Sequence, residues 1–136
     1  ELDAIVGAIA GGWPFEYAQT IVLGGDEFFA RRGSTVGGYV DALYGYLLGV
    51  APDASGRAFW VDQIANKGMD RYTVALAFCT YTVTHGRVVD FAYPWLLRRA
   101  PSASERAGWT GQLDSGYRQE AFFATLVASD EYWSKV

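Results

Sequence analysis

The sequence predicts an all-α protein in which repeated helical units pack into one compact helical domain. The main observation is a repeat: residues 39–63 and 88–112 agree at thirteen positions with a constant offset of 49 residues. Hydrophobic residues also recur at helical spacing, and Gly and Pro mark the ends of the helical stretches. A repeat of this period indicates one supersecondary unit used more than once, each unit burying its apolar face on a neighbour.

The repeat also suggests how the chain is divided. The segment Leu23–Phe29 is similar to Val127–Trp133, so the first 33 residues resemble the back half of a repeat unit. We therefore expect the chain to be part of a longer polypeptide. The expected ranges are 1–33 for the half unit and 34–87 and 88–136 for two repeat units, within a single all-α domain over 1–136.

The first 33 residues predict three helices. Leu2–Ala10 is apolar and is followed by two glycines, which favour the end of a helix. Pro14 suits the first turn of a second helix, which reaches about Leu23. Asp26 and Glu27 then begin a short helix, because acidic side chains stabilise the positive end of a helix.

The first full copy of the repeat predicts a long helix and then a proline-led helix. Ser34 is the expected N-cap of the long helix, which runs to about Leu48. Gly49 suits a left-handed residue that stops it. The next helix begins after Pro52. Its expected core-facing residues are Phe59, Trp60 and Ile64.

The second copy keeps this order with changes in detail. Ser102 and Glu105 fit a capping box at the start of the proline-led helix. Pro94 replaces Gly45 within the long helix, which predicts a kink or a late helix start. Third helices are expected at about 71–81 and 118–128, and a short last helix begins at Ser129.

Composition and charge exclude several classes of function. The net charge is −4, so the basic surface that nucleic acid requires is absent. No apolar run reaches the length of a membrane span. We expect no cofactor and no metal, because zinc ligands and the spaced acids of a calcium loop are missing. The single cysteine, Cys79, lies in an apolar helical stretch and predicts a buried thiol.

Two stretches resemble a known family. Leu47–Trp60 (LLGVAPDASGRAFW) and Val127–Tyr132 (VASDEY) resemble the repeat of the bacterial domain-of-unknown-function family 4214, which is similar in turn to the phycobilisome linker domain. The second copy departs from the family pattern at Arg98, Ser102 and Glu105. The resemblance implies a helical module of secreted or cell-surface bacterial proteins, and hence an extracellular or surface location. It implies no established catalysis and supplies no catalytic residue.

The carboxylate pairs and the single histidine are the residues that catalysis would use. Asp26–Glu27 and Asp130–Glu131 lie at predicted helix starts, and adjacent helical residues do not face each other. His85 has no obvious Ser or Cys partner, so we expect a surface or boundary side chain and no triad. We therefore expect no enzyme; a two-carboxylate glycosidase, the alternative, would need acids that converge in a cleft.

Arg57 and Arg106 occupy one position of the repeat, near a helix start. Asp41 and Asp90 recur as well. Since recurrence indicates an architectural role, we expect each arginine to pair with the aspartate of its own copy. Contact with a ligand is the alternative, and both arginines are kept as candidate ligand-binding residues.

Surface aromatic side chains are the remaining candidates for a binding site. Tyr46 and Trp95 lie about a quarter-turn from the apolar stripe of the long helix, given roughly 100° per residue. Trp13 and Tyr17 lie one helical turn apart. Exposed rings can anchor a protein partner or stack on a sugar. Packing at the boundary of the core is the alternative interpretation.

These observations favour a non-catalytic interaction or scaffolding module that binds a protein partner. A carbohydrate-binding module that uses the surface aromatic residues on a surface glycan is the alternative. A phycobilisome-type linker is a further possibility, although nothing else in the sequence points to a photosynthetic partner. The candidate binding residues are Trp95, Tyr46, Trp13, Tyr17, Arg57 and Arg106.

Overall fold

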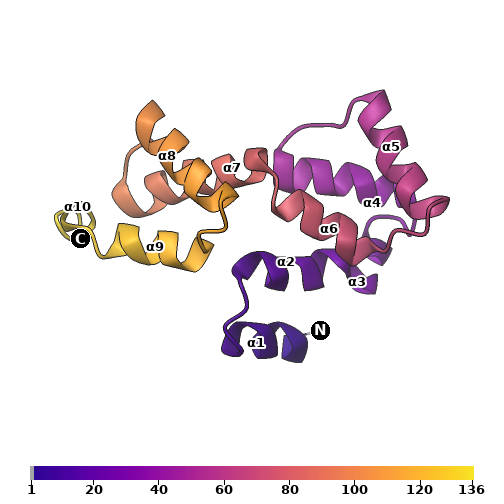
Figure 1. Ribbon diagram of the computed structural model, residues 1–136, viewed down its shortest axis with the longest axis horizontal. Helices are drawn as coiled ribbons and strands as arrows, with labels where there is room; N and C mark the ends of the chain where they lie inside the picture. The colour runs from indigo at the N-terminus through magenta and orange to yellow at the C-terminus, as the bar shows by residue number, and fades with distance from the viewer. Residues whose placement is uncertain (1) are drawn as a thin grey trace. The chain divides into compact units, whose positions relative to one another are not determined.

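The computed structural model describes residues 2–136 (Figure 1). Within this range there are ten α-helices, two π-helical turns and no strand, which confirms the all-α prediction. The chain forms two compact units: the N-terminal unit ends at Cys79, and the C-terminal unit begins at Thr80. The predicted ranges 1–33, 34–87 and 88–136, and their union in one domain, stay predictions.

The N-terminal unit contains the half unit and the first full copy of the repeat. Its helix α2 packs on α6 and α1, and α5 packs on α4. The core is formed by side chains of α2, α3, α4, η1, α5 and α6, including Tyr39, Leu43 and Phe78, which are fully buried. Its elements are α1 (Leu2–Ala10), α2 (Phe15–Gly24), α3 (Asp26–Arg31), α4 (Val36–Leu43), the π turn η1 (Tyr44–Leu48), α5 (Ala54–Ala65) and α6 (Arg71–Cys79).

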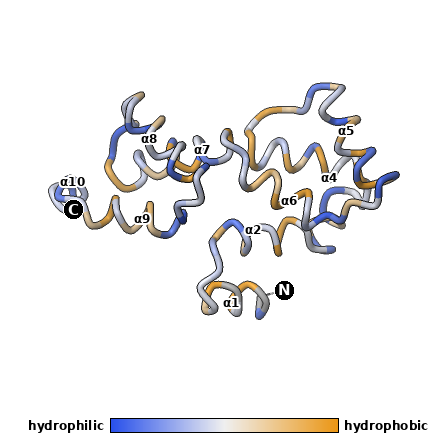
Figure 2. The backbone as a smooth tube through the Cα atoms, in the orientation of Figure 1, coloured by the Kyte–Doolittle hydropathy of each residue, from blue (hydrophilic) through white to orange (hydrophobic). Residues whose placement is uncertain are grey.

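The C-terminal unit contains the second full copy. Helix α8 packs on α7, while α9 and α10 pack on η2. The core includes Val89, Leu97 and Phe122 from three of these elements. In both units, hydrophobic residues lie along the packed helices, and the turn between α5 and α6 is hydrophilic (Figure 2). The elements are α7 (Thr82–Ala92), the π turn η2 (Tyr93–Leu97), α8 (Ala103–Asp114), α9 (Gln119–Val127) and α10 (Asp130–Trp133).

The helix starts use side-chain caps. The Ser102–Glu105 capping box is present, with Ser102 Oγ accepting from Glu105 N and the Glu105 carboxylate accepting from Ser102 N. The predicted cap at Ser34 is wrong: Thr35 is the N-cap of α4, and its Oγ1 accepts from Gly38 N at 3.1 Å. Ser34 instead has a φ of 53°, which continues the turn begun at Gly33.

Both long helices end in a π turn, at η1 and η2. Helix α7 runs directly into η2, so the late start predicted from Pro94 is wrong. A π turn interrupts the regular backbone ladder and so accommodates a residue that has no N–H. Gly45 has the same place in η1, so the turn does not depend on proline. Each turn is closed by a left-handed residue, Gly49 with φ 72° and Arg98 with φ 57°.

The core side of α5 differs from the prediction at one residue. Trp60 is buried and Ile64 is half-buried, as expected, but Phe59 is 54% exposed. Consecutive helical residues point about 100° apart, so Phe59 and Trp60 cannot both face the core. The Phe59 ring instead packs edge-on against Trp60 with 5.1 Å between ring centroids.

Candidate functional site

The two π turns place one aromatic ring each on the surface. Tyr46 is 62% exposed and Trp95 is 61% exposed, in agreement with their predicted place beside the apolar stripe. The leucines that flank them, Leu47 and Leu96, are buried. The same repeat position therefore presents an aromatic ring in both units.

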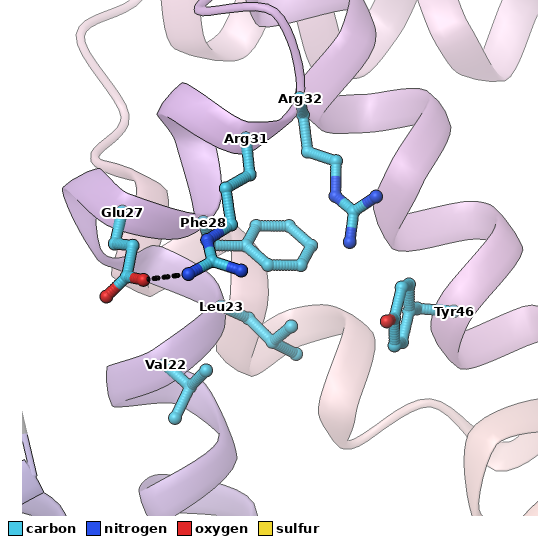
Figure 3. A pocket seen from close by; sticks show the side chains of 7 residues that line it. All are labelled: Val22, Leu23, Glu27, Phe28, Arg31, Arg32 and Tyr46. Carbon is cyan, nitrogen blue, oxygen red and sulfur yellow. Dashed lines mark hydrogen bonds and ion pairs between the residues drawn. The ribbon is translucent and has the colours of Figure 1, made fainter.

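Tyr46 lines a cleft of about 350 Å³ in the N-terminal unit (Figure 3). Its ring lies 6.0 Å from that of Phe28, edge to face. The guanidinium of Arg32 lies beside both rings, with its carbon 4.9 Å from the Phe28 centroid and 5.2 Å from the Tyr46 centroid. Cation–π attraction holds the guanidinium there. The lining residues are Val22, Leu23, Glu27, Phe28, Arg31, Arg32 and Tyr46.

The two arginines of this cleft differ in their partners. Arg31 donates to Glu27 across one helical turn at 2.5 Å. Arg32 Nε is buried and has no hydrogen-bond partner within the described residues. Arg32 carries no signal in the sequence, because Arg32 and Tyr46 come from different elements and no spacing rule joins them.

Trp95 belongs to a second ring cluster, in the C-terminal unit. Its indole stacks on Phe91, one helical turn earlier, with 5.6 Å between centroids and 28° between planes. Phe123 of α9 contacts the indole edge-on at 6.5 Å. Phe91, like Trp95, is 61% exposed. The side chains Phe91, Trp95 and Phe123 are called the ring cluster below.

Trp13 and Tyr17 form a third, smaller pair at the start of α2. Their rings meet edge to face at 6.0 Å, and the residues are 54% and 44% exposed. The pair is thus brought together as its spacing predicts. The candidate rings of the N-terminal unit therefore divide between the cleft and this pair.

Arg57 and Arg106 form the predicted ion pairs. Arg57 donates to both carboxylate oxygens of Asp41 at 2.7 and 3.1 Å. Arg106 does the same with Asp90, at 2.8 and 2.9 Å. These hydrogen bonds raise the pKa of each arginine. The bidentate geometry in both copies supports the architectural role.

Acidic side chains at helix starts also form ion pairs with arginine. Asp26 is ion-paired with Arg71, which also donates to the carbonyl of Gly24. Arg99 donates to both oxygens of Glu105 and of Glu131, at 2.6 to 2.9 Å. Arg99 lowers the pKa of both carboxyl groups to about 2. These acids are therefore anions held by arginine.

His85 is buried, which corrects the expected surface or boundary side chain. Its Nδ1 lies 2.7 Å from Asp114 Oδ1, and Thr82 Oγ1 donates to the other oxygen of Asp114 at 2.9 Å. Asp114 lies 29 residues from His85, so no local spacing in the sequence points to this partner. The Thr82 hydroxyl bonds the carboxylate and not the imidazole, so the arrangement differs from a nucleophile–histidine–acid triad.

Two other expectations concern Cys79 and metal binding. Cys79 is buried, as predicted, and burial raises the pKa of its thiol to about 11, so it is protonated at neutral pH. Across the described residues, no three or more His, Cys, Asp or Glu side chains are grouped so that they could hold a metal ion. None of the helices between residues 2 and 136 has the length and hydropathy needed to cross a bilayer.

The fold and its surface define a helical repeat module with aromatic side chains at a recurring exposed position. Residues 18–82 match the model of the family described as "Domain of unknown function (DUF4214)", and this segment belongs to that family. The match includes the first full copy, the cleft and Tyr46. Comparisons with curated proteins and with solved structures give no match. The family description names no activity.

Proposed function

We propose that this chain is a non-catalytic interaction or scaffolding module that binds a protein partner through exposed aromatic side chains. The family resemblance suggests a secreted or cell-surface bacterial protein as its setting. The observation that carries the proposal is the ring cluster, in which two large apolar side chains are each 61% exposed beside one another.

Covering these rings is energetically favourable. Each square ångström of apolar surface removed from water contributes about 25 cal/mol. The stacking of Trp95 on Phe91 also fixes the orientation of both rings before a partner arrives, which reduces the entropy lost on binding. Tryptophan is among the residues most often found at the energetic centre of protein interfaces.

The absence of catalysis is part of the proposal and is supported by the state of the acids. With pKa values near 2, Glu105 and Glu131 are poor proton donors at neutral pH. Asp26 is paired with Arg71, and Asp114 with His85 and Thr82. Each of these carboxylates has a partner that accounts for its place in the fold.

A carbohydrate ligand is the alternative, because Trp95 offers an exposed indole on which a sugar ring could stack. We prefer a protein partner because the ring cluster is apolar, whereas a sugar site also needs hydrogen-bonding side chains around its rings.

The test is a binding screen on protein and glycan arrays with a matched pair of variants. Phe91→Ala and Trp95→Ala should each weaken binding to the protein hit by more than about 1 kcal/mol, as truncated hot-spot residues do. Phe59→Ala removes a similarly exposed phenylalanine from the N-terminal unit and should leave the affinity unchanged. Full affinity in a folded Phe91→Ala/Trp95→Ala double variant would refute the proposed site, and hits confined to glycans would favour the alternative.

A further inference from the structure

The cleft beside Tyr46 combines one unpaired charge with an apolar lining. Leu23 and Phe28 are buried at its base, while Val22 and Tyr46 are partly exposed at its edges. Arg32 extends between Phe28 and Tyr46 toward this space (Figure 3). Apolar walls around a few well-placed polar groups are typical of small-molecule sites, and the volume of about 350 Å³ lies in their usual range.

The charges in the cleft do not balance. Glu27 is the acid that lines it, and it is ion-paired with Arg31. Arg32 forms no ion pair within the described residues, and its Nε–H is enclosed by protein without an acceptor. An enclosed donor without an acceptor is unfavourable. The site is therefore short of one negatively charged acceptor.

We propose that this cleft binds an organic carboxylate that carries an apolar group next to the carboxylate. The inference goes beyond the proposed function, because it concerns the N-terminal unit and a different chemistry from the ring cluster. The carboxylate would face the Arg32 guanidinium, and the apolar group would lie against Val22, Leu23 and Phe28.

The geometry of Arg32 favours a carboxylate. A guanidinium presents its N–H groups in a flat fork that matches two carboxylate oxygens. The rings of Phe28 and Tyr46 flank the guanidinium carbon at 4.9 and 5.2 Å, and its terminal N–H groups are the part that a ligand would approach. Tyr46 is exposed, and a small movement of its ring would open Nε to the same ligand.

The lining favours an apolar body over a sugar acid. Four of the seven lining residues are aliphatic or aromatic: Val22, Leu23, Phe28 and Tyr46. Glu27 and Arg31 are already paired with each other. The hydroxyl groups of a uronic acid would lack partners there, and unpaired polar groups disfavour binding. A free aryl acid and a peptide that ends in an aromatic residue share the required chemistry.

The test is a titration of the ¹⁵N-labelled chain with 3-phenylpropionate, observed at the Arg32 Nε–Hε resonance. This proton is buried and should exchange slowly enough to be seen, and its loss in Arg32→Lys assigns it. We expect a saturable shift with 3-phenylpropionate and none with the neutral 3-phenylpropionamide. Equal binding of the amide, or no binding of the acid, would overturn the proposal.

Two further ligands test whether the natural ligand is a peptide or a small acid, and whether it must carry an apolar group. Acetyl-Leu-Phe with a free carboxyl terminus should bind, and its amidated form should not. Tighter binding of the peptide than of the free acid assigns a peptide as the natural source, and the reverse assigns a small acid. Glucuronate should bind at least tenfold more weakly than 3-phenylpropionate; equal affinity would refute the apolar requirement.

Variants connect binding to Arg32. Arg32→Gln should abolish binding, and Arg32→Lys, which keeps the charge without the fork, should weaken it at least tenfold. Arg87→Gln removes an exposed arginine of the C-terminal unit and should leave the affinity unchanged. Unchanged affinity in Arg32→Gln, with the helical circular dichroism of the parent chain, would place the carboxylate elsewhere. If Arg32→Gln does not fold, the folded Arg32→Lys variant decides the question by the same criterion.

Discussion

Trp60 and Trp109 occupy one repeat position but have different neighbours. Trp60 is buried against Phe78, with ring centroids 5.1 Å apart. Trp109 is half-buried against Phe122 at 4.8 Å, and its Nε1 donates to Tyr93 Oη at 3.1 Å. The repeat thus keeps the indole, while each third helix supplies a phenylalanine from a different turn.

The burial of these indoles predicts their contribution to stability. Trp60→Ala should lower the free energy of unfolding by about 3–5 kcal/mol, as truncation of a buried tryptophan does. Trp109→Ala should cost less, because part of the ring is exposed. Trp109→Phe should cost about 0.5–1.5 kcal/mol for the lost hydrogen bond. Urea unfolding followed by circular dichroism measures all three; an unchanged midpoint in Trp60→Ala would contradict the buried position.

Arg99 makes stability depend on pH through Glu105 and Glu131. Both carboxyl groups have a pKa of about 2 in the folded chain, against a usual value of 4.5. A lowered pKa means that the folded state is stabilised when these groups are ionised. The stabilisation is complete above pH 4.5 and is lost as the pH falls toward about 2.

We therefore expect Arg99→Met to be less stable than the parent chain at pH 6, and the difference to shrink between pH 4.5 and pH 2. Urea midpoints at several pH values give this comparison. Arg87→Met removes the same charge from an exposed site and controls for the change in net charge. A difference between Arg99→Met and the parent chain that stays constant down to pH 2 would contradict the prediction.

At the scale of the elements, both long helices carry a glycine at the same position of the repeat. Gly37 and Gly86 are separated by the repeat offset of 49. A Cβ atom at Gly37 would lie 2.3 Å from Arg57 Nη2, and one at Gly86 would lie 2.6 Å from Arg106 Nη2. Each glycine therefore makes room for the arginine that pairs with the aspartate of the same helix.

This arrangement predicts different effects for two glycines of one long helix. Gly37→Ala must displace the Arg57 guanidinium, the mobile end of a long side chain, and weaken its exposed pair with Asp41, which offsets part of the gain from replacing a helical glycine. At Gly45 a Cβ would meet no atom within 4 Å, so Gly45→Ala should stabilise the helix by roughly 0.5–1 kcal/mol, and Gly37→Ala should stabilise it less. Thermal unfolding of the two variants measures the contrast; equal stabilisation would show that Arg57 moves aside without loss.

The sequence predicts elements better than their details, for physical reasons. Helix order, the Ser102 cap and the left-handed Gly49 follow from local chemistry. The π turns cannot be predicted in this way, because the same residues also suit an α-helix and only tertiary packing makes the extra residue favourable. Local chemistry does not distinguish Ser34 from Thr35 as the cap, because both residue types are good caps, and the fold decides which of the two neighbours has the extended backbone.

The whole chain comprises two compact units with separate hydrophobic cores. The buried cluster that contains Leu43 lies entirely before Thr80, and the cluster that contains Leu113 lies entirely after it. A substitution in one core should therefore change amide hydrogen exchange mainly in the unit that contains it. Leu113→Ala should raise exchange rates in the C-terminal unit by about tenfold or more and leave the N-terminal unit nearly unchanged.

Leu43→Ala is the matched variant, since both leucines are buried, and it should give the reverse pattern. Hydrogen exchange followed by mass spectrometry resolves the two units. Equal loss of protection across residues 2–136 in either variant would show that the two cores unfold as one cooperative structure.

Candidate site residues can be predicted where one helix or the repeat itself carries the signal. Tyr46 and Trp95 follow from their place beside the apolar stripe of a helix, and the Arg57–Asp41 and Arg106–Asp90 pairs follow from recurrence in the two copies. The Arg32 cleft and the His85–Asp114 pair join side chains from separate elements without such a signal. Such contacts arise from tertiary packing, which local periodicity does not specify.

The π turn has a consequence for how this repeat tolerates insertions and deletions. A π turn is equivalent to one residue inserted into an α-helix. Deleting Gly45 would remove that residue and convert the turn into a regular α-helix, with Asp41 and Leu47 still on their present faces. A deletion within the regular part of the same helix would instead rotate the residues before it by about 100° relative to those after it, and Asp41 would point away from Arg57. In this repeat, the long helix should therefore tolerate a single-residue deletion better at the π turn than elsewhere.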